Sequence, residues 1–94
     1  MMIDVGKFGE ILVSRPAGHD AYLAAKAYLL AEKPEKIELD FSGVKVLTPS
    51  WLDEFLTPLQ KELGSACVRV LQSQNPSVIA SLATIASSNN LPFQ

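Results

Sequence analysis

Residues 40–56 read DFSGVKVLTPSWLDEFL and contain the end of a strand, a turn and the start of a helix. Charged and apolar residues alternate over Lys36–Phe41, which predicts a strand, and Ser42-Gly43 ends it. Thr48 suits the N-cap of the following helix, and Pro49 suits its first position. The apolar side chains that follow fall on one face of that helix: Leu52, Phe55, Leu56, Leu59 and Leu63.

Upstream of this unit, the sequence predicts a β-hairpin and a helix. Met2–Val5 and Glu10–Ser14 are short β-rich runs separated by GKFG, which suits a tight turn between antiparallel strands. An alanine- and leucine-rich helix is expected over Ala17–Glu32, and Pro34 stops it. Its small-residue stripe is predicted at Ala17, Ala21, Ala24, Tyr28 and Ala31, with Ala25 and Leu29 alongside.

Downstream, the chain predicts one more strand and one more helix. Pro58 has no N–H to donate within the preceding helix, so we expect a kink or a break near Thr57. Ala66–Leu71 predicts a strand, Asn75-Pro76 starts a further helix, and the tail Leu91–Gln94 is expected to fray. These elements predict a single α/β domain over residues 1–94. Its order is β-β-α-β-α-β-α, with a mixed four-stranded sheet and helices packed on it.

Composition limits the classes of function. The 94 residues carry a net charge of -2 and the eight lysine and arginine residues are scattered, so neither a nucleic-acid partner nor a membrane surface is expected. The sequence shows no signal peptide and no long apolar run, which favours a soluble, cytoplasmic protein. Cys67 is the single cysteine, so no internal disulfide can form, and its apolar neighbours predict burial.

Residue types that carry catalytic chemistry are sparse. The sequence has no glycine-rich phosphate loop, and one histidine with one cysteine cannot form a zinc site. His19 is expected to be an exposed residue near a helix start rather than a general base. Asp53 and Glu54 point about 100° apart on a helix, which favours a solvated face over a paired acid and base. We therefore expect a non-enzymatic protein with no catalytic residue, no metal and no cofactor.

Two positions leave alternatives open. Trp51, in the first turn of its helix, either plugs the edge of the core or stands exposed as a binding anchor. Asp40 and Ser42 follow a strand, and ligand sites of α/β proteins form at the carboxyl ends of strands. Alternatively, both residues bond the backbone amides of their own turn. The ligand alternative predicts a small-molecule site at the strand ends near Asp40, Ser42 and Thr48.

Residues 40–56 resemble the STAS superfamily, which includes bacterial anti-sigma factor antagonists. They are most similar to the STAS-like domain family of unknown function. The segments DFSGV, LTPS and LDEF carry the resemblance, and Val68–Leu71 followed by Asn75–Val78 extends it. The resemblance implies a STAS-like fold over most of the chain.

The resemblance also implies a function and a set of site residues. In the classical antagonists, a kinase of the GHKL ATPase class phosphorylates a serine at this helix start. That serine falls at Pro49 here, which leaves Thr48 and Ser50 as candidate phosphorylation sites. We expect a bacterial regulatory protein–protein interaction domain whose partner is a GHKL-type ATPase or anti-sigma kinase. A homodimer through Trp51 or through the Met2–Val5 edge strand is an alternative. The expected partner-binding residues are Ser42, Thr48, Pro49, Ser50, Trp51, Asp53 and Glu54.

Overall fold

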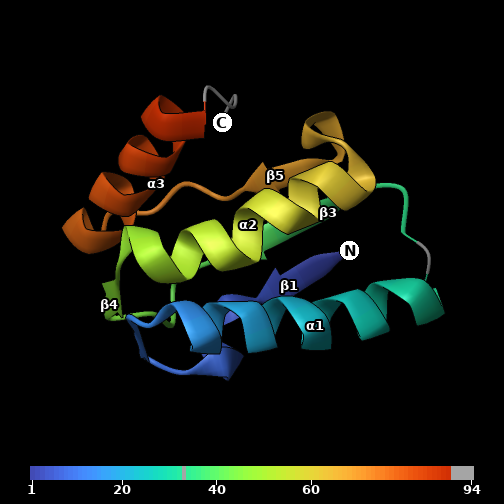
Figure 1. Cartoon of the computed structure of the whole chain (residues 1–94), viewed down its shortest axis with the longest axis horizontal. Coiled ribbons are helices and arrows are strands. Elements are labelled where there is room, and N and C mark those ends of the chain that lie inside the picture. The colour runs from blue at the N-terminus through green and yellow to red at the C-terminus, as the bar shows by residue number, and fades with distance from the viewer. Residues whose placement is uncertain (33, 90–94) are drawn as a thin grey trace.

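The computed structural model describes residues 1–32 and 34–89, and Figure 1 shows long helices beside a set of short strands. The helices are α1 (Arg15–Glu32), α2 (Pro49–Leu63) and α3 (Pro76–Asn89). Two short 3-10 helices, η1 (Val5–Phe8) and η2 (Ser65–Cys67), lie before β2 and β5. The tail Leu91–Gln94, for which fraying is expected, lies outside the described residues.

The strands of the described residues form two small sheets. The larger has the order β1 (Met2–Asp4), β3 (Ile37–Asp40), β5 (Val68–Val70), and the smaller pairs β2 (Ile11–Leu12) with β4 (Val46–Leu47). All three pairings are parallel. The expected α/β fold with three helices is therefore confirmed. The expectation of one four-stranded sheet is wrong, because the five strands divide into sheets of three and two.

The expected hairpin between residues 2–5 and 10–14 is also wrong, because β1 pairs with β3 while β2 pairs with β4. The Asp4 side chain accepts a hydrogen bond from the Gly6 N–H at 3.1 Å and so starts η1. Gly6 is also close to the loop between β3 and β4, since a Cβ placed on it would be 3.0 Å from the Cα of Gly43. This turn directs the chain to a second sheet instead of folding it back on β1.

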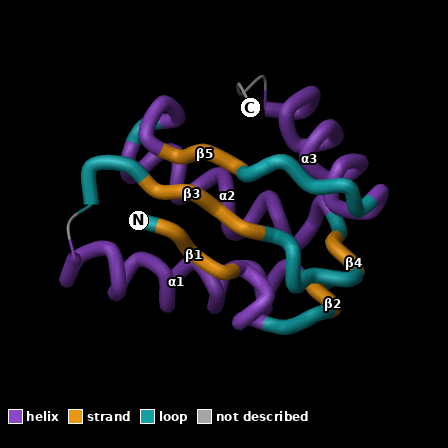
Figure 2. The backbone as a smooth tube through the Cα atoms, turned by 180° about the vertical axis from the view of Figure 1, so that it is seen from behind, coloured by secondary structure: helices purple, strands orange, loops and turns teal. Residues whose placement is uncertain are grey.

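The helices α1 and α2 cover one face of the three-stranded sheet, and the opposite face carries polar side chains. Figure 2, seen from behind, shows β1, β3 and β5 in front of α2. Along β5, Val68 and Val70 are buried between the layers, while Arg69 is exposed. The core fills the space between sheet and helices, and its largest fully buried side chains include Trp51, Phe41, Phe55, Ile37, Leu39, Leu52, Leu56 and Leu59.

Gly18 brings α1 and α2 close together. It is buried, and a Cβ placed on it would overlap the Trp51 carbonyl oxygen and lie 3.1 Å from the Glu54 Cβ. The buried face of α1 continues through Ala21, Tyr22, Ala25 and Leu29. The predicted stripe is therefore right at Ala21, Ala25 and Leu29, and wrong at the exposed Ala17, Ala24, Tyr28 and Ala31.

Two further expectations concern the second half of the chain. Of the kink or break expected near Thr57, the break does not occur, because the helix α2 continues through Pro58. Cys67 is only half-buried, because it lies in η2 and β5 begins one residue later. The position of α3 agrees with its predicted start at Pro76, and Val78 and Ile85 pack into the core.

Candidate functional site at the start of α2

Thr48 joins the start of α2 to the segment that precedes α1. Its backbone N–H donates to the Leu12 carbonyl at 3.0 Å, and its hydroxyl donates to the Val13 carbonyl, also at 3.0 Å. The same hydroxyl oxygen accepts a hydrogen bond from the Trp51 N–H at 3.5 Å, which confirms Thr48 as the N-cap with Pro49 next to it. A phosphate on Thr48 would lose the donated bond and place negative charge beside two carbonyl oxygens.

Side chains of α3 form hydrogen bonds with the backbone groups of β4 that face away from β2. The Leu47 N–H donates to the Ser77 hydroxyl at 2.8 Å, and the Leu47 carbonyl accepts from the hydroxyls of Ser77 and Ser81 at 2.8 and 2.7 Å. The Asn75 side-chain amide donates to the carbonyls of Val44 and Lys45, each at 3.0 Å. Figure 1 shows that α1, α2 and α3 all begin at this end of the molecule.

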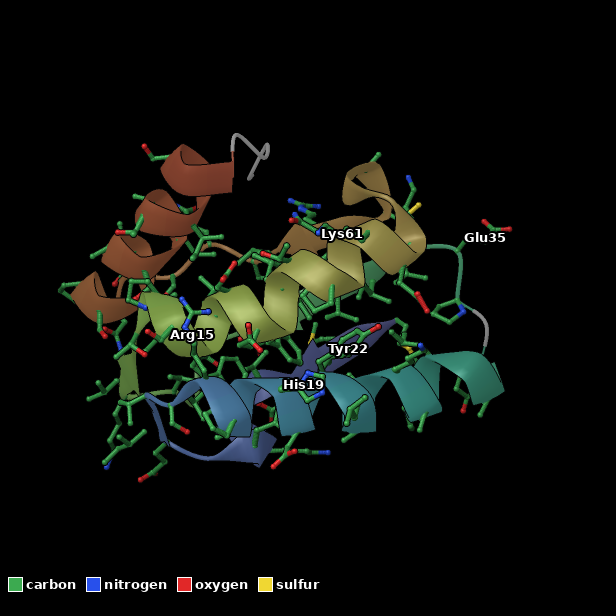
Figure 3. All side chains as sticks on the ribbon, viewed as in Figure 1. Arg15, His19, Tyr22, Glu35 and Lys61 are labelled. Atoms are coloured by element: carbon green, nitrogen blue, oxygen red, sulfur yellow. The ribbon has the colours of Figure 1, made fainter. Side chains whose placement is uncertain are left out.

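Arg15 links the first turn of α1 to α2. Its guanidinium lies 3.0 Å from an Asp53 carboxylate oxygen and 3.3 Å from one of Glu54, and Figure 3 shows it beside the start of α2. The hydrogen bond to Asp53 is the main reason that the pKa of Arg15 is raised above its ordinary value. The other Asp53 oxygen accepts from the Thr57 hydroxyl at 2.9 Å. Asp53 and Glu54 therefore serve the contact between the two helices.

Trp51 belongs to the core. Its side chain is 1% exposed, and its ring stacks on Phe55 with the centroids 4.9 Å apart. Phe8 of η1 packs against both rings, at 6.4 and 5.6 Å between centroids. The alternative in which Trp51 stands exposed as a binding anchor is therefore wrong, because the residue lies on the inner side of the first turn of α2 and not on its outer side.

Next to the capped helix start lies an apolar patch that we call the corner surface, which consists of Ile11, Val13, Val46, Pro49 and Ser50. The three aliphatic side chains are between 40% and 64% exposed, and Ile11 and Val46 are register partners in the smaller sheet. Pro49 and Ser50 are half-buried, and no hydrogen bond of the described residues involves the Ser50 hydroxyl. Exposed apolar side chains that lie together beside a polar group are typical of protein interaction surfaces.

Asp40 and Ser42 form a turn at the end of β3. Asp40 Oδ1 accepts a hydrogen bond from the Ser42 N–H at 2.9 Å, as in an Asx-turn. Ser42 itself is exposed, and within the described residues no hydrogen bond joins Asp40 or Ser42 to Thr48. The structure therefore brings Thr48, Pro49, Ser50, Asp53 and Glu54 together on the first turns of α2. Asp40 and Ser42 have a separate role in their own turn.

Several residues of this region were not predicted as part of a site. The exposure of Ile11, Val13 and Val46 depends on pairing between distant segments, which no local pattern reveals. Arg15 lies two residues before the predicted start of its helix at Ala17, so the sequence did not place it on a helix. Within the described ranges, no three histidine, cysteine or carboxylate side chains gather in a way that could hold a metal ion. None of the helices described there is long and apolar enough to cross a membrane.

Comparison with known proteins identifies the family to which this chain belongs. A family model described as a STAS-like domain of unknown function matches residues 23–78, which is more than half of the chain and includes β3, β4 and α2. Comparisons with curated proteins and with solved structures gave no significant match. The matched segment contains the strand–turn–helix unit described above, so the chain belongs to the family of STAS-like domains of unknown function.

Proposed function

We propose that this domain is a non-catalytic regulatory module that binds a protein partner through the corner surface. The single observation that carries the proposal is the exposure of Ile11, Val13 and Val46 beside the capped start of α2. Burying three such side chains against a partner would contribute a few kcal/mol of favourable free energy, at about 25 cal/mol per Å² of apolar surface. The expected partner is a GHKL-type ATPase, the class that binds the anti-sigma factor antagonists that this sequence resembles.

The rigidity of this region supports the same proposal. Hydrogen bonds from Thr48, Ser77, Ser81 and Asn75 hold β2, β4, α2 and α3 in one arrangement. A surface that is already ordered loses little conformational entropy on binding. The starts of three helices also lie at this end, and the positive ends of their dipoles favour an acidic group on the partner.

A phosphorylation switch would act at Ser50 in this arrangement. The Thr48 hydroxyl is already engaged by Val13 and Trp51, and proline occupies the position of the usual acceptor. Ser50 has an uncommitted hydroxyl in the first turn of α2, where backbone amides and the helix dipole stabilise a phosphate. A phosphate there would add up to two negative charges to an apolar contact and would oppose docking.

Site-specific photo-crosslinking in the source cells tests the proposal. A photoreactive residue at Val46 or Ser50 should label a GHKL-type ATPase, whereas one at Leu23, which is exposed on α1, should not. The variant Val46→Lys should weaken binding of the identified partner at least tenfold by burying an unpaired charge, and Leu23→Lys should leave binding unchanged. Equal labelling from Leu23 would overturn the assignment of the surface, and a labelled protein without an ATPase domain would overturn the assignment of the partner.

The alternative of a small-ligand site near Asp40 and Ser42 has less support. The Asp40 carboxylate already accepts the Ser42 N–H, and Gly43 lies against the backbone of Gly6. These contacts account for the residues as parts of a turn. A metabolite panel that raises the melting temperature in a concentration-dependent way would reverse this preference.

A further inference from the structure

The outer edge of β1 is the starting point for a second inference, which does not depend on the corner surface. In the parallel ladder, Met2 is the register partner of Glu38, and the Glu38 N–H donates to the Met1 carbonyl at 2.8 Å. The ladder therefore uses backbone groups of Met1 and Ile3, because successive residues of a strand face opposite sides. The N–H and C=O groups of Met2 and the N–H of Asp4 point away from β3, at the edge of the sheet, whereas the Asp4 C=O accepts the first hydrogen bond of η1.

A groove runs beside this edge. It has a volume of about 270 Å³ and lies between β1, η1 and α1, with Ile3, Phe8, Ala24, Ala25 and Tyr28 among its lining residues. The groove continues onto Met2 and Tyr28, whose side chains are 57% and 56% exposed. Free main-chain groups next to an apolar groove form the arrangement that proteins use to bind an extended peptide as an added strand.

The charge at the end of β1 indicates which peptide would fit. Asp4 and Asp40 are register partners, and each uses Oδ1 to accept a backbone N–H of its own turn. No ion pair within the described residues involves either carboxylate. Lys7 is the basic side chain at the groove, and it lies on η1 beyond the strand. A strand added beside β1 would place its outward side chains next to Asp4, where a cross-strand neighbour of opposite charge is favoured.

We propose that the β1 edge binds an extended segment of a partner protein in which apolar and basic residues alternate. The main chain of that segment pairs with the N–H and C=O of Met2 and with the N–H of Asp4. Its apolar side chains enter the groove beside α1, and its lysine or arginine side chains lie on the open face next to Asp4 and Asp40. This site is separate from the start of α2, so one domain would bind two segments.

Titration of the isotope-labelled chain by NMR tests the proposal directly. The probe is a capped nine-residue peptide with alternating lysine and valine, and its control has glutamate in place of lysine. The lysine peptide should shift the Met2 and Asp4 amide resonances and slow their hydrogen exchange. The glutamate peptide should bind several-fold more weakly at low salt. Equal binding of the two peptides, or shifts confined to the start of α2, would overturn the proposal.

Substitutions separate the main-chain contribution from the side chains. Met2→Pro removes the outward N–H without touching the ladder to β3, whereas Met2→Thr shortens the side chain and keeps the N–H. The proline variant should bind the lysine peptide roughly three- to tenfold more weakly than the threonine variant. Ala24→Lys should block the groove, while Ala27→Lys adds the same charge at an exposed position of the same helix and should not. Equal affinities within either pair would contradict the proposed mode.

A second copy of this chain is the competing occupant of the edge. Light scattering at high concentration should show a monomer for the unsubstituted protein. A dimer that Met2→Pro dissociates would mean that β1 of a second copy fills the edge, and this result would overturn the proposal of a peptide partner.

Discussion

Replacing Gly18 with alanine is expected to destabilise the domain, although the same change would stabilise an isolated helix. Gly18 lies within α1, and its N–H donates to the Ser14 carbonyl at 3.1 Å, so the position is helical. Alanine at such a position gains up to about 1 kcal/mol in helix propensity over glycine. The tertiary contact opposes this gain, because the new methyl group would overlap the Trp51 carbonyl oxygen and press on the Glu54 Cβ.

The size of the effect follows from the atoms that would have to move. The Trp51 carbonyl is backbone, so the clash cannot be relieved by rotating a side chain, and α1 must shift away from α2. Overfilling a packed contact costs about 1–3 kcal/mol, and a rigid neighbour places the cost in the upper part of that range. After the gain in propensity is subtracted, the net loss is about 1–2 kcal/mol, which corresponds to a fall in melting temperature of roughly 4–16 °C.

Thermal and urea unfolding followed by circular dichroism measure this change. Ala27→Gly is the matched control, because Ala27 is exposed on the same helix and reports helix propensity alone. Because this substitution introduces a glycine instead of removing one, it should lower the free energy of unfolding by about 1 kcal/mol. If Gly18→Ala melted at the same temperature as the unsubstituted protein or higher, the close contact between α1 and α2 would be wrong, and the arrangement of the helices would need revision.

Two other substitutions test local features of α2. Gln60 is 4% exposed, and neither its amide nitrogen nor its oxygen has a hydrogen-bond partner among the described residues, so Gln60→Met should raise the free energy of unfolding by about 1–3 kcal/mol in urea titrations. An unchanged urea midpoint would show that these polar groups are satisfied in solution. Thr48→Ala should lower stability by about 1–2 kcal/mol, because it removes both the helix cap and the bond to Val13, whereas Thr48→Ser should restore most of it. Equal stabilities of the alanine and serine variants would refute the role of the hydroxyl.

The parts of the fold that were predictable from the sequence are those fixed by local chemistry. Thr48 followed by proline, and Asn75 followed by proline, mark two helix starts that the structure confirms. The alternation before Ser42 predicts a strand that becomes β3. Each of these signals acts within one turn of helix or one strand, so sequence neighbours are enough to interpret it.

The errors arise where distant segments decide the outcome. Glycines at positions 6 and 9 suit a hairpin, but Asp4 captures the Gly6 N–H and β1 pairs with β3. In α1, alanines occur on every side, so periodicity alone gives little contrast between the buried Ala25 and the exposed Ala24. The corner surface was missed for the same reason. Whether Val46 stays exposed is decided by the pairing of β4 with β2 and by α3 at the other edge of β4, and both are distant in sequence.

The contacts of Thr48 also determine how a switch could work in this domain. In the anti-sigma factor antagonists that this sequence resembles, the phosphorylated serine occupies the position of Pro49, the first residue of α2. In this chain the hydroxyl of the preceding residue, Thr48, caps the helix and donates to the Val13 carbonyl. A phosphate on Thr48 would therefore disrupt the junction of β2 and α2 and lower stability. A phosphate on Ser50 would be accommodated by the helix start and would alter only the proposed partner contact. Phosphomimetic variants at the two positions should therefore affect different properties of the domain. Thr48→Glu should lower the melting temperature, while Ser50→Glu should leave it nearly unchanged and weaken partner binding.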